Sequence, residues 1–284
     1  MAEKRGFCFG VQDAVELAVS TAAARPKGTV YALGPVIHNP QEVSRLEAAG
    51  VNQSTALDQV PPGSTLVIRS HGVRPEVIDE ARRRGLDVVD ATCKLVKRAQ
   101  NIVRDLHDDG YLVVMIGDAK HPEVVGVVGY AEKVIVINSP EEVADRVPPR
   151  AKLGVVAQTT HAPAHVARVV AAILAQPFRE VRIVNTLCDE VSRRQAAAVA
   201  LCGEVDVMFV LGGLHSANTR QLARLCEQEG VATWHLETWD QFRPEMVADK
   251  AVAGVAAGTS TPEWIIQEFV ERLGNVTPAQ KSGS

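Results

Sequence analysis

Short apolar, β-branched runs alternate along this chain with segments of helical periodicity. The apolar runs are typical of buried strands, and they lie at residues 30–33, 65–68, 88–89, 112–116, 134–137, 153–156, 181–184, 205–211, 233–236 and 252–256. The helical segments between them lie at residues 11–24, 75–84, 94–108, 164–175, 192–201, 217–229 and 262–273. Strands that alternate with helices in this way predict small, mostly parallel sheets flanked by helices, and therefore an α/β fold.

Composition and charge agree with this fold and narrow the class of protein. A chain of 284 residues with only 4% aromatic residues suits parallel strands covered by helices. The net charge of −4 and the absence of a basic stripe argue against nucleic acid and membrane surfaces as partners. The charged opening residues 1–5 lack the apolar run of an export signal, and no apolar stretch is long enough to span a bilayer. We therefore expect a cytoplasmic protein.

Polar signatures follow several of the predicted strands. They are Ser70-His71-Gly72, His121-Pro122-Glu123, Gln158-Thr159-Thr160, Ser216-Ala217-Asn218 and Gly258-Thr259-Ser260. Ligands of parallel α/β sheets bind beyond the carboxyl ends of the strands, where helix N-termini favour anions. We therefore expect a small anion as ligand, held by hydrogen-bond donors among these residues. No glycine-rich stretch has the Gly-Lys-Ser/Thr ending of a P-loop, so a standard nucleotide site is not expected.

Five cysteines are an odd number for a chain from a reducing compartment, which makes metal binding or catalysis a better explanation than disulfides. Cys8, Cys93 and Cys188 lie at nearly even intervals and divide the chain into three similar blocks. Three thiolates are one short of the set that holds an iron–sulfur cluster, which would leave one iron open. Cys202 and Cys226 lie in helical, aliphatic surroundings and are expected to be structural. The predicted lobes are residues 9–93, 94–188 and 189–274, with a disordered tail at 275–284.

Each of these residues also has a structural interpretation. A single cysteine is more often a small buried residue than a ligand, and serine or asparagine at a helix start is commonly a cap. Three histidines lie in strand-to-loop positions: His38 before Asn-Pro, His71 before Gly and His121 before Pro. Without the cysteines, a structural role would be as good an interpretation of each as a functional one. Glu123 could be an ordinary first-turn carboxylate favoured by the helix dipole.

Taken in order, eight motifs resemble the 4-hydroxy-3-methylbut-2-enyl diphosphate reductase family over nearly the whole chain. They are Gly6-Phe7-Cys8-Phe9-Gly10-Val11, Val36-Ile37-His38-Asn39-Pro40, Ser70-His71-Gly72-Val73, Asp90-Ala91-Thr92-Cys93, His121-Pro122-Glu123-Val124, Gln158-Thr159-Thr160, Ser216-Ala217-Asn218-Thr219 and Ala257-Gly258-Thr259-Ser260. The ordered set is far more specific than any one motif. This resemblance implies three pseudo-threefold-related lobes around a central [4Fe–4S] cluster.

The resemblance also implies ligands and roles. The cluster would be held by Cys8, Cys93 and Cys188, and the diphosphate by His38, His71, His121, Ser216, Asn218 and Ser260. Glu123 would relay protons, with Thr159 helping to orient the leaving hydroxyl. The implied reaction is the reductive dehydroxylation of the allylic diphosphate to isopentenyl and dimethylallyl diphosphate. Because no flavin or nicotinamide fingerprint is present, we expect an external one-electron donor such as ferredoxin or flavodoxin.

Several positions depart from the family pattern. Only seven residues precede Cys8, so one lobe is expected to lack its first strand. Lys94 replaces the usual proline, and its charge would lie near the cluster and raise its potential. Ala217 takes a place where the family often has serine or glycine, and the run Asp189-Glu190-Val191 replaces small polar residues. The alternative functions are another open-iron enzyme, similar to quinolinate synthase or a hydro-lyase, and a degenerate, non-catalytic cluster-binding redox sensor.

Overall fold

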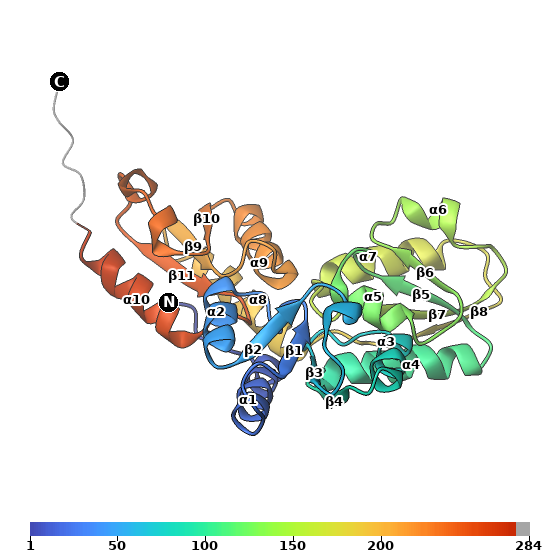
Figure 1. Ribbon diagram of the computed structural model, residues 1–284. Coiled ribbons are helices and arrows are strands. Elements are labelled where there is room, and N and C mark those ends of the chain that lie inside the picture. The colour runs from blue at the N-terminus through green and yellow to red at the C-terminus, as the bar shows by residue number, and fades with distance from the viewer. Residues whose placement is uncertain (277–284) are drawn as a thin grey trace. The chain divides into compact units, whose positions relative to one another are not determined.

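The computed structural model describes residues 1–276 of the chain, which form two compact units. The larger unit comprises Gly10–Ile37 and Val43–Cys188. The smaller unit comprises Met1–Phe9, His38–Glu42 and the described chain from Asp189 onward. Figure 1 labels the helices and strands of both units.

The first sheet belongs to the larger unit and has four parallel strands in the order β2-β1-β3-β4. The elements of this part of the chain are α1 (Phe9–Ala23), β1 (Val30–Leu33), α2 (Pro40–Ala48), β2 (Val51–Ser54), a 3-10 helix (Leu57–Gln59), β3 (Thr65–Ile68), α3 (Pro75–Arg83) and β4 (Asp87–Asp90). Every residue of the central strand β3 is buried. Leu66 and Ile68 of β3 pack in one core with Val77 and Ile78 of α3, so α3 covers one face of the sheet.

The second sheet, also in the larger unit, has four parallel strands in the order β6-β5-β7-β8. Its elements are α4 (Lys94–Asp108), β5 (Leu112–Ile116), α5 (Pro122–Val128), β6 (Val134–Ile137), α6 (Glu142–Arg146), β7 (Lys152–Ala157), α7 (Pro163–Leu174) and β8 (Glu180–Ile183). Alternate residues of β5 enter two different cores. Val113 and Met115 pack against α4 and α5, while Val114 and Ile116 pack against α6 and α7. Because both faces are covered, β5 is apolar throughout, as central parallel strands are.

The third sheet lies in the smaller unit and has three parallel strands in the order β10-β9-β11. Its elements are α8 (Asp189–Cys202), β9 (Val207–Leu211), α9 (Ala217–Gln228), β10 (Ala232–Leu236), two 3-10 helices (Trp239–Gln241 and Pro244–Val247), β11 (Ala253–Ala257) and α10 (Glu263–Gly274). Met208 and Val210 pack with α8 and α9 on one face, and Phe209 packs with α10 on the other. Three small parallel sheets flanked by helices confirm the predicted α/β fold class.

Among the described residues, the first sheet has four strands and the third sheet has three. Where a fourth strand would lie beside β11, the N–H of Ala2 donates a hydrogen bond to the carbonyl of Val255 at 2.8 Å. Ala2 is buried and packs in the core of this sheet. The segment before Cys8 therefore belongs to the third sheet, and the first sheet has its full four strands.

One strand and three α-helices of the described chain were not predicted. The edge strand β2 carries the polar residues Asn52 and Gln53, which hide the apolar pattern of a strand. Helix α2 has a low apolar content, α5 is almost wholly apolar, and α6 is very short, so none of these three shows clear helical periodicity.

Residues 275 and 276 of the predicted tail are described, with Asn275 capping α10. Residues 277–284 lie outside the described part of the chain, and the predicted lobe boundaries stay a prediction.

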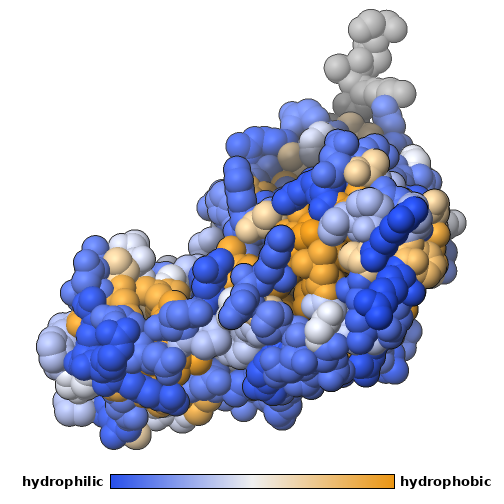
Figure 2. Space-filling view, turned by 90° about the vertical axis from the view of Figure 1, so that its right-hand side faces the viewer, coloured by the Kyte–Doolittle hydropathy of each residue, from blue (hydrophilic) through white to orange (hydrophobic). Residues whose placement is uncertain are grey.

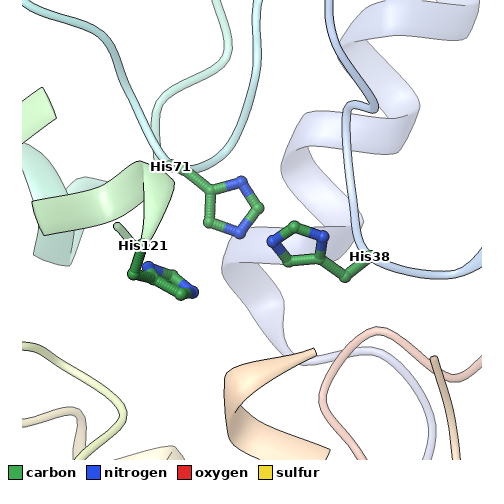
Figure 3. Close-up of side chains that lie close together, drawn as sticks. All are labelled: His38, His71 and His121. Atoms are coloured by element: carbon green, nitrogen blue, oxygen red, sulfur yellow. The ribbon is translucent and has the colours of Figure 1, made fainter. Parts of the chain in front are cut away.

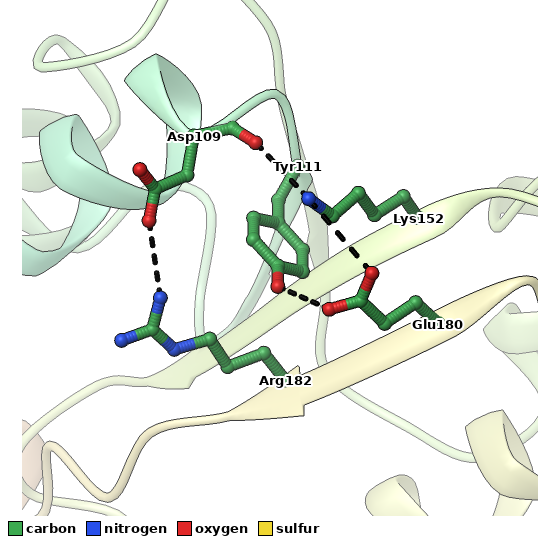
Figure 4. Close-up of polar contacts among 5 residues, drawn as sticks. All are labelled: Asp109, Tyr111, Lys152, Glu180 and Arg182. Carbon is green, nitrogen blue, oxygen red and sulfur yellow. Dashed lines mark hydrogen bonds and ion pairs between the residues drawn. The ribbon is translucent and has the colours of Figure 1, made fainter.

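A network of polar side chains holds the edge strand β8 beside its neighbours (Figure 4). Tyr111 donates a hydrogen bond to Glu180, and the Lys152 Nζ atom lies 3.8 Å from a Glu180 oxygen and 4.0 Å from the centroid of the Tyr111 ring. Arg182 pairs with Asp109 at 3.1 Å. Exposed ion pairs contribute little stability one by one, so the network adds only modestly to the backbone pairing of β8 with β7.

The surface is largely polar where Figure 2 shows it, with apolar residues between the polar ones. Phe178, which precedes β8, and Ile183, the last residue of β8, are among the exposed large apolar residues. No helix within residues 1–276 is long and apolar enough to cross a membrane.

Candidate functional site

The three evenly spaced cysteines occupy equivalent positions in the topology. Each directly precedes a helix, namely α1, α4 or α8. The backbone N–H of each also donates to a carbonyl just beyond the third strand of a sheet: Cys8 to Thr259 at 3.1 Å, Cys93 to Ser70 at 3.0 Å, and Cys188 to Thr159 at 2.9 Å. Helix N-termini stabilise thiolates, which are the form that binds metal. All three thiols are thus placed where metal ligands are favoured.

Cys93 shows this environment in most detail. Burial raises the pKa of its thiol, while hydrogen bonds from the N–H groups of Leu95 and Val96 in the first turn of α4 act in the opposite direction. Gly10 of α1 comes so close that a Cβ atom built on it would lie 2.5 Å from the Cys93 Sγ atom. A side chain at position 10 would therefore collide with this thiol.

Cys202 and Cys226 lie in a different environment. Both are buried in the core that packs α8 and α9 against the third sheet. Burial raises the pKa of Cys226 to about 12, and its thiol is hydrogen-bonded with that of Cys202. These two thiols stay protonated and fill the core, as expected from the sequence. No disulfide links any cysteine of the described chain.

Glu123, at the start of α5, is a buried carboxyl group held by Thr159, which follows β7. The Thr159 N–H donates to Oε1 at 2.7 Å and its hydroxyl donates to Oε2 at 2.8 Å. Burial raises the pKa of Glu123, and the two hydrogen bonds from Thr159 oppose that rise. Because the raised pKa favours the protonated form, this group can act as a proton donor.

His71 and His121 lie side by side within the larger unit (Figure 3). Their ring centroids are 5.7 Å apart with the rings nearly perpendicular. The N–H of Glu123 donates to the His121 Nδ1 atom at 3.2 Å, so Nδ1 carries no proton and Nε2 is the donor. A Cβ on Gly126 of α5 would lie 3.3 Å from the Gly72 carbonyl group, so a glycine there allows the loop after β3 to approach α5 closely.

In the smaller unit, Ser216, Asn218 and Ser260 lie at the carboxyl ends of β9 and β11. Ser216 caps α9, where its hydroxyl oxygen accepts from the N–H of Thr219 at 3.3 Å. Asn218 is buried, and its Nδ2 atom has no hydrogen-bond partner among the described residues. The Ser260 hydroxyl donates to the carbonyl of His38 at 3.1 Å. The orphaned amide donor of Asn218 is what an anion-binding group would leave in the absence of its ligand.

Two residues that the sequence did not single out for a role support this arrangement. The Gln158 side-chain oxygen accepts from the N–H of Asp118 at 3.1 Å, and its nitrogen donates to the Thr160 hydroxyl at 3.2 Å. Gln158 therefore ties together the loops that follow β5 and β7. Gly10 is the second, since its close approach to Cys93 is visible only in the structure. Both residues belong to motifs of the sequence, and this membership was the only signal that could have pointed to them.

Lys94 lies at the surface and is paired with a carboxylate. Its side chain is 80% exposed, and its Nζ atom pairs with the Asp13 carboxylate of α1 at 3.2 Å. Solvent and the opposite charge of Asp13 screen the charge of Lys94, and its effect on a cluster stays a prediction.

The chain is similar to known proteins over nearly its full length. The family model described as LytB protein matches residues 1–274. A 4-hydroxy-3-methylbut-2-enyl diphosphate reductase of Geobacter metallireducens is 46% identical over 283 residues, which cover 99% of each chain. The protein of the same name from Aquifex aeolicus is 40% identical over 284 residues, covering 99% of this chain and 97% of that protein.

Solved structures give the same result. The structure of an (E)-4-hydroxy-3-methyl-but-2-enyl diphosphate reductase, described as the terminal enzyme of the non-mevalonate pathway, matches with a TM-score of 0.70 and 40% identity. The match covers 97% of this chain and 98% of that one. The structure of the E-1-hydroxy-2-methyl-but-2-enyl-4-diphosphate reductase from Plasmodium falciparum matches with a TM-score of 0.90 and 26% identity, covering 96% and 86% of the two chains.

Proposed function

The chain belongs to the LytB protein family, and on that basis we propose that it catalyses the reductive dehydroxylation of 4-hydroxy-3-methylbut-2-enyl diphosphate. The products are isopentenyl diphosphate and dimethylallyl diphosphate. The chain is thus an oxidoreductase of the non-mevalonate isoprenoid pathway. Relatives that bear this enzyme's name are 40% to 46% identical to it over nearly the full chain, which favours this function over the alternatives.

We further propose that Cys8, Cys93 and Cys188 hold a [4Fe–4S] cluster. The observation that carries this assignment is their common setting, in which each cysteine heads a helix and bonds to the carbonyl beyond a third strand. Three ligands leave one iron without a protein ligand. When bound, such a cluster supplies the electrons and a Lewis-acidic iron for removal of the hydroxyl. A cytoplasmic one-electron donor such as ferredoxin or flavodoxin recharges it in this proposal.

In this proposal the diphosphate is bound by hydrogen-bond donors of histidine, serine and asparagine side chains. We assign His38, His71, His121, Ser216, Asn218 and Ser260 to this role. The Nε2–H of His121 and the orphaned amide group of Asn218 support it, since each is a donor that an anionic oxygen can satisfy. Ser216 and Asn218 also lie in the cap and first turn of α9, where the helix dipole favours anions.

Glu123 is the proton donor in this proposal. Hydroxide is a poor leaving group unless it is protonated, so a carboxylic acid near the leaving oxygen lowers the barrier to its departure. The burial of Glu123 favours its protonated form, and the two bonds from Thr159 fix its orientation. Thr159 is therefore assigned to orient the acid.

Anaerobic reconstitution followed by turnover tests the proposal. The full-length chain should take up about four irons. With reduced methyl viologen as donor, it should convert the allylic diphosphate into both five-carbon diphosphates, measured by mass spectrometry. A Cys226→Ala variant is the matched control, because that thiol lies in the core away from any proposed ligand. A folded chain with a full cluster that converts none of this substrate, or that converts dicarboxylic acids instead, would refute the assignment.

A further inference from the structure

The segment that leads to Cys8 is held without a strand of its own. Cys93 and Cys188 are preceded by β4 and β8, each paired along its length with a neighbouring strand. The residues before Cys8 form no strand, although Ala2 and Cys8 donate backbone hydrogen bonds to Val255 and Thr259. Between these two bonds, other contacts must hold the backbone.

Arg194 of α8 provides those contacts from inside the smaller unit. Its side chain is only 3% exposed. Its Nη1 atom donates to the carbonyl of Gly6 at 2.8 Å, and Nη2 donates to the carbonyl of Arg5 at 3.3 Å. Its Nε atom donates to Glu190 Oε1 at 3.1 Å, so the charge is paired one turn away on the same helix. A single guanidinium group thus binds two successive carbonyls and one carboxylate.

The local sequence fits this arrangement. Gly6 has a φ of +73°, which glycine adopts without the steric cost that other residues have. A Cβ on Gly6 would lie 3.1 Å from an oxygen of Glu263, and that carboxylate pairs with the side chain of Arg5 at 2.8 Å. The turn at residues 5 and 6 is therefore fixed from α8 by Arg194 and from α10 by Glu263.

Burying a charged guanidinium group is unfavourable unless all its donors are used. The planar fork of arginine matches two adjacent carbonyls, which the single ammonium group of lysine cannot reach together. The contacts of Arg194 are concentrated on the two residues that turn the chain toward Cys8. An arginine that only stabilised α8 would need no bonds to the segment before Cys8.

We propose that Arg194 is a positioning residue for Cys8: its guanidinium group fixes the carbonyls of residues 5 and 6 and so holds the thiol in place for metal binding. The inference rests on the proposed function for its purpose, since Cys8 needs a fixed position only as a ligand. The replacement of small polar residues by Glu190 in this chain is part of the arrangement, because Glu190 neutralises the buried arginine.

Hydrogen exchange of the full-length, cluster-free chain tests the positioning directly. In Arg194→Gln, peptides spanning residues 2–8 should exchange about tenfold faster, the effect expected from losing charge-assisted bonds to the backbone. Cys8 should also be alkylated faster while Cys93 keeps its rate. Arg146→Gln is the matched control, because Arg146 makes the same four-residue-spaced pair with Glu142 but is exposed. It should change neither measurement.

Arg194→Lys separates the fork from the charge. Arg194→Lys keeps a cation beside Glu190 and should therefore melt at the temperature of the parent chain. Its residues 2–8 should nevertheless exchange faster than those of the parent. Unchanged exchange of residues 2–8 in a folded Arg194→Gln variant would overturn the proposal. Faster exchange spread evenly over α8 and the third sheet would also overturn it, as would an Arg194→Lys variant whose residues 2–8 exchange at the parent's rate.

The iron-loaded chain provides the second measurement. Iron should be lost to a chelator several-fold faster from Arg194→Gln than from the parent or from Arg146→Gln. Equal iron loss would overturn the link to Cys8. If the parent chain takes up no iron at all, the proposed function fails, whereas the exchange and alkylation experiments still decide whether Arg194 positions the Cys8 segment.

Discussion

Replacing Thr159 by valine should move the pH dependence of the reaction in a direction that the structure specifies. The substitution preserves the shape of a buried side chain and removes the hydroxyl that donates to Glu123 Oε2 at 2.8 Å. The N–H of residue 159 still donates to Oε1, and its carbonyl still accepts from Cys188. The change therefore isolates one hydrogen bond to the carboxyl group.

The size of the effect follows from the charge of the acceptor. A hydrogen bond to an ionised carboxylate contributes about 2 kcal/mol, and one to a neutral acid contributes about 1 kcal/mol. Losing the hydroxyl therefore disfavours the ionised form of Glu123 by about 1 kcal/mol, which is about a fivefold change in proton affinity. Because burial already raises the pKa of Glu123, the loss raises it further.

The assay is the pH profile of kcat/KM for the parent, Thr159→Val and Thr159→Ser. If Glu123 donates its proton, activity declines as pH rises through the pKa of Glu123, and Thr159→Val should move this decline to higher pH by about 0.7 unit. Thr159→Ser retains the hydroxyl and should keep the parent profile. The bound cluster acts alike in all three proteins, so the difference reports the hydroxyl. A decline that stays in place or moves to lower pH in Thr159→Val would refute the reasoning.

Three further substitutions test other parts of the site. Glu123→Gln should retain iron but lower turnover at least a hundredfold, the usual contribution of a general acid. Glu123→Gln should also be more stable than the parent at neutral pH. Because the pKa of Glu123 is raised in the folded state, the parent's stability falls as pH rises from the ordinary glutamate range through the folded pKa. Glutamine does not titrate, so the variant lacks this fall. Thermal melting across this pH range checks the sign, and equal pH dependence in both proteins would contradict it. Gly10→Ala should destabilise the protein and weaken iron binding, because the clash of its Cβ with Cys93 costs about 1–3 kcal/mol and the gain in helix propensity is at most about 1 kcal/mol. Gly274→Ala, whose Cβ would meet no atom within 4 Å, is the control and should melt no lower than the parent. Cys93→Ser should reduce the iron bound per chain while Cys226→Ala retains it; equal iron content in the two would remove Cys93 from the ligand set.

Local patterns were sufficient for much of the fold. The strands β3, β5 and β6 and the helix α4 begin and end at the residues that the sequence predicts. Each of these strands is made mostly of aliphatic residues, and α4 has a strong amphipathic pattern. The edge strand β2 was missed because an edge strand needs fewer apolar residues, and its polar ones remove the local signal.

The site was predictable to a smaller extent. The motif His121-Pro122-Glu123 was compatible with a carboxylate at a helix start, although α5 itself was not predicted, and proline at the first helical position agrees with α5. Nothing in the sequence indicated that both Glu123 oxygens would be held by Thr159, because Glu123 lies at the start of α5 and Thr159 follows β7, 36 residues later in the chain. The bridging role of Gln158 was invisible for the same reason.

The sequence by itself determined that the chain alternates strands with helices, because this property depends on residues close together in the chain. The tertiary structure alone decided which sheet the segment before each of the three cysteines joins. Cys8 stands at the start of the chain, yet its backbone bonds to Thr259 and its approach is held by Arg194. Hydrogen bonds between such distant segments depend on how the sheets and helices pack, and no local pattern of residues records them.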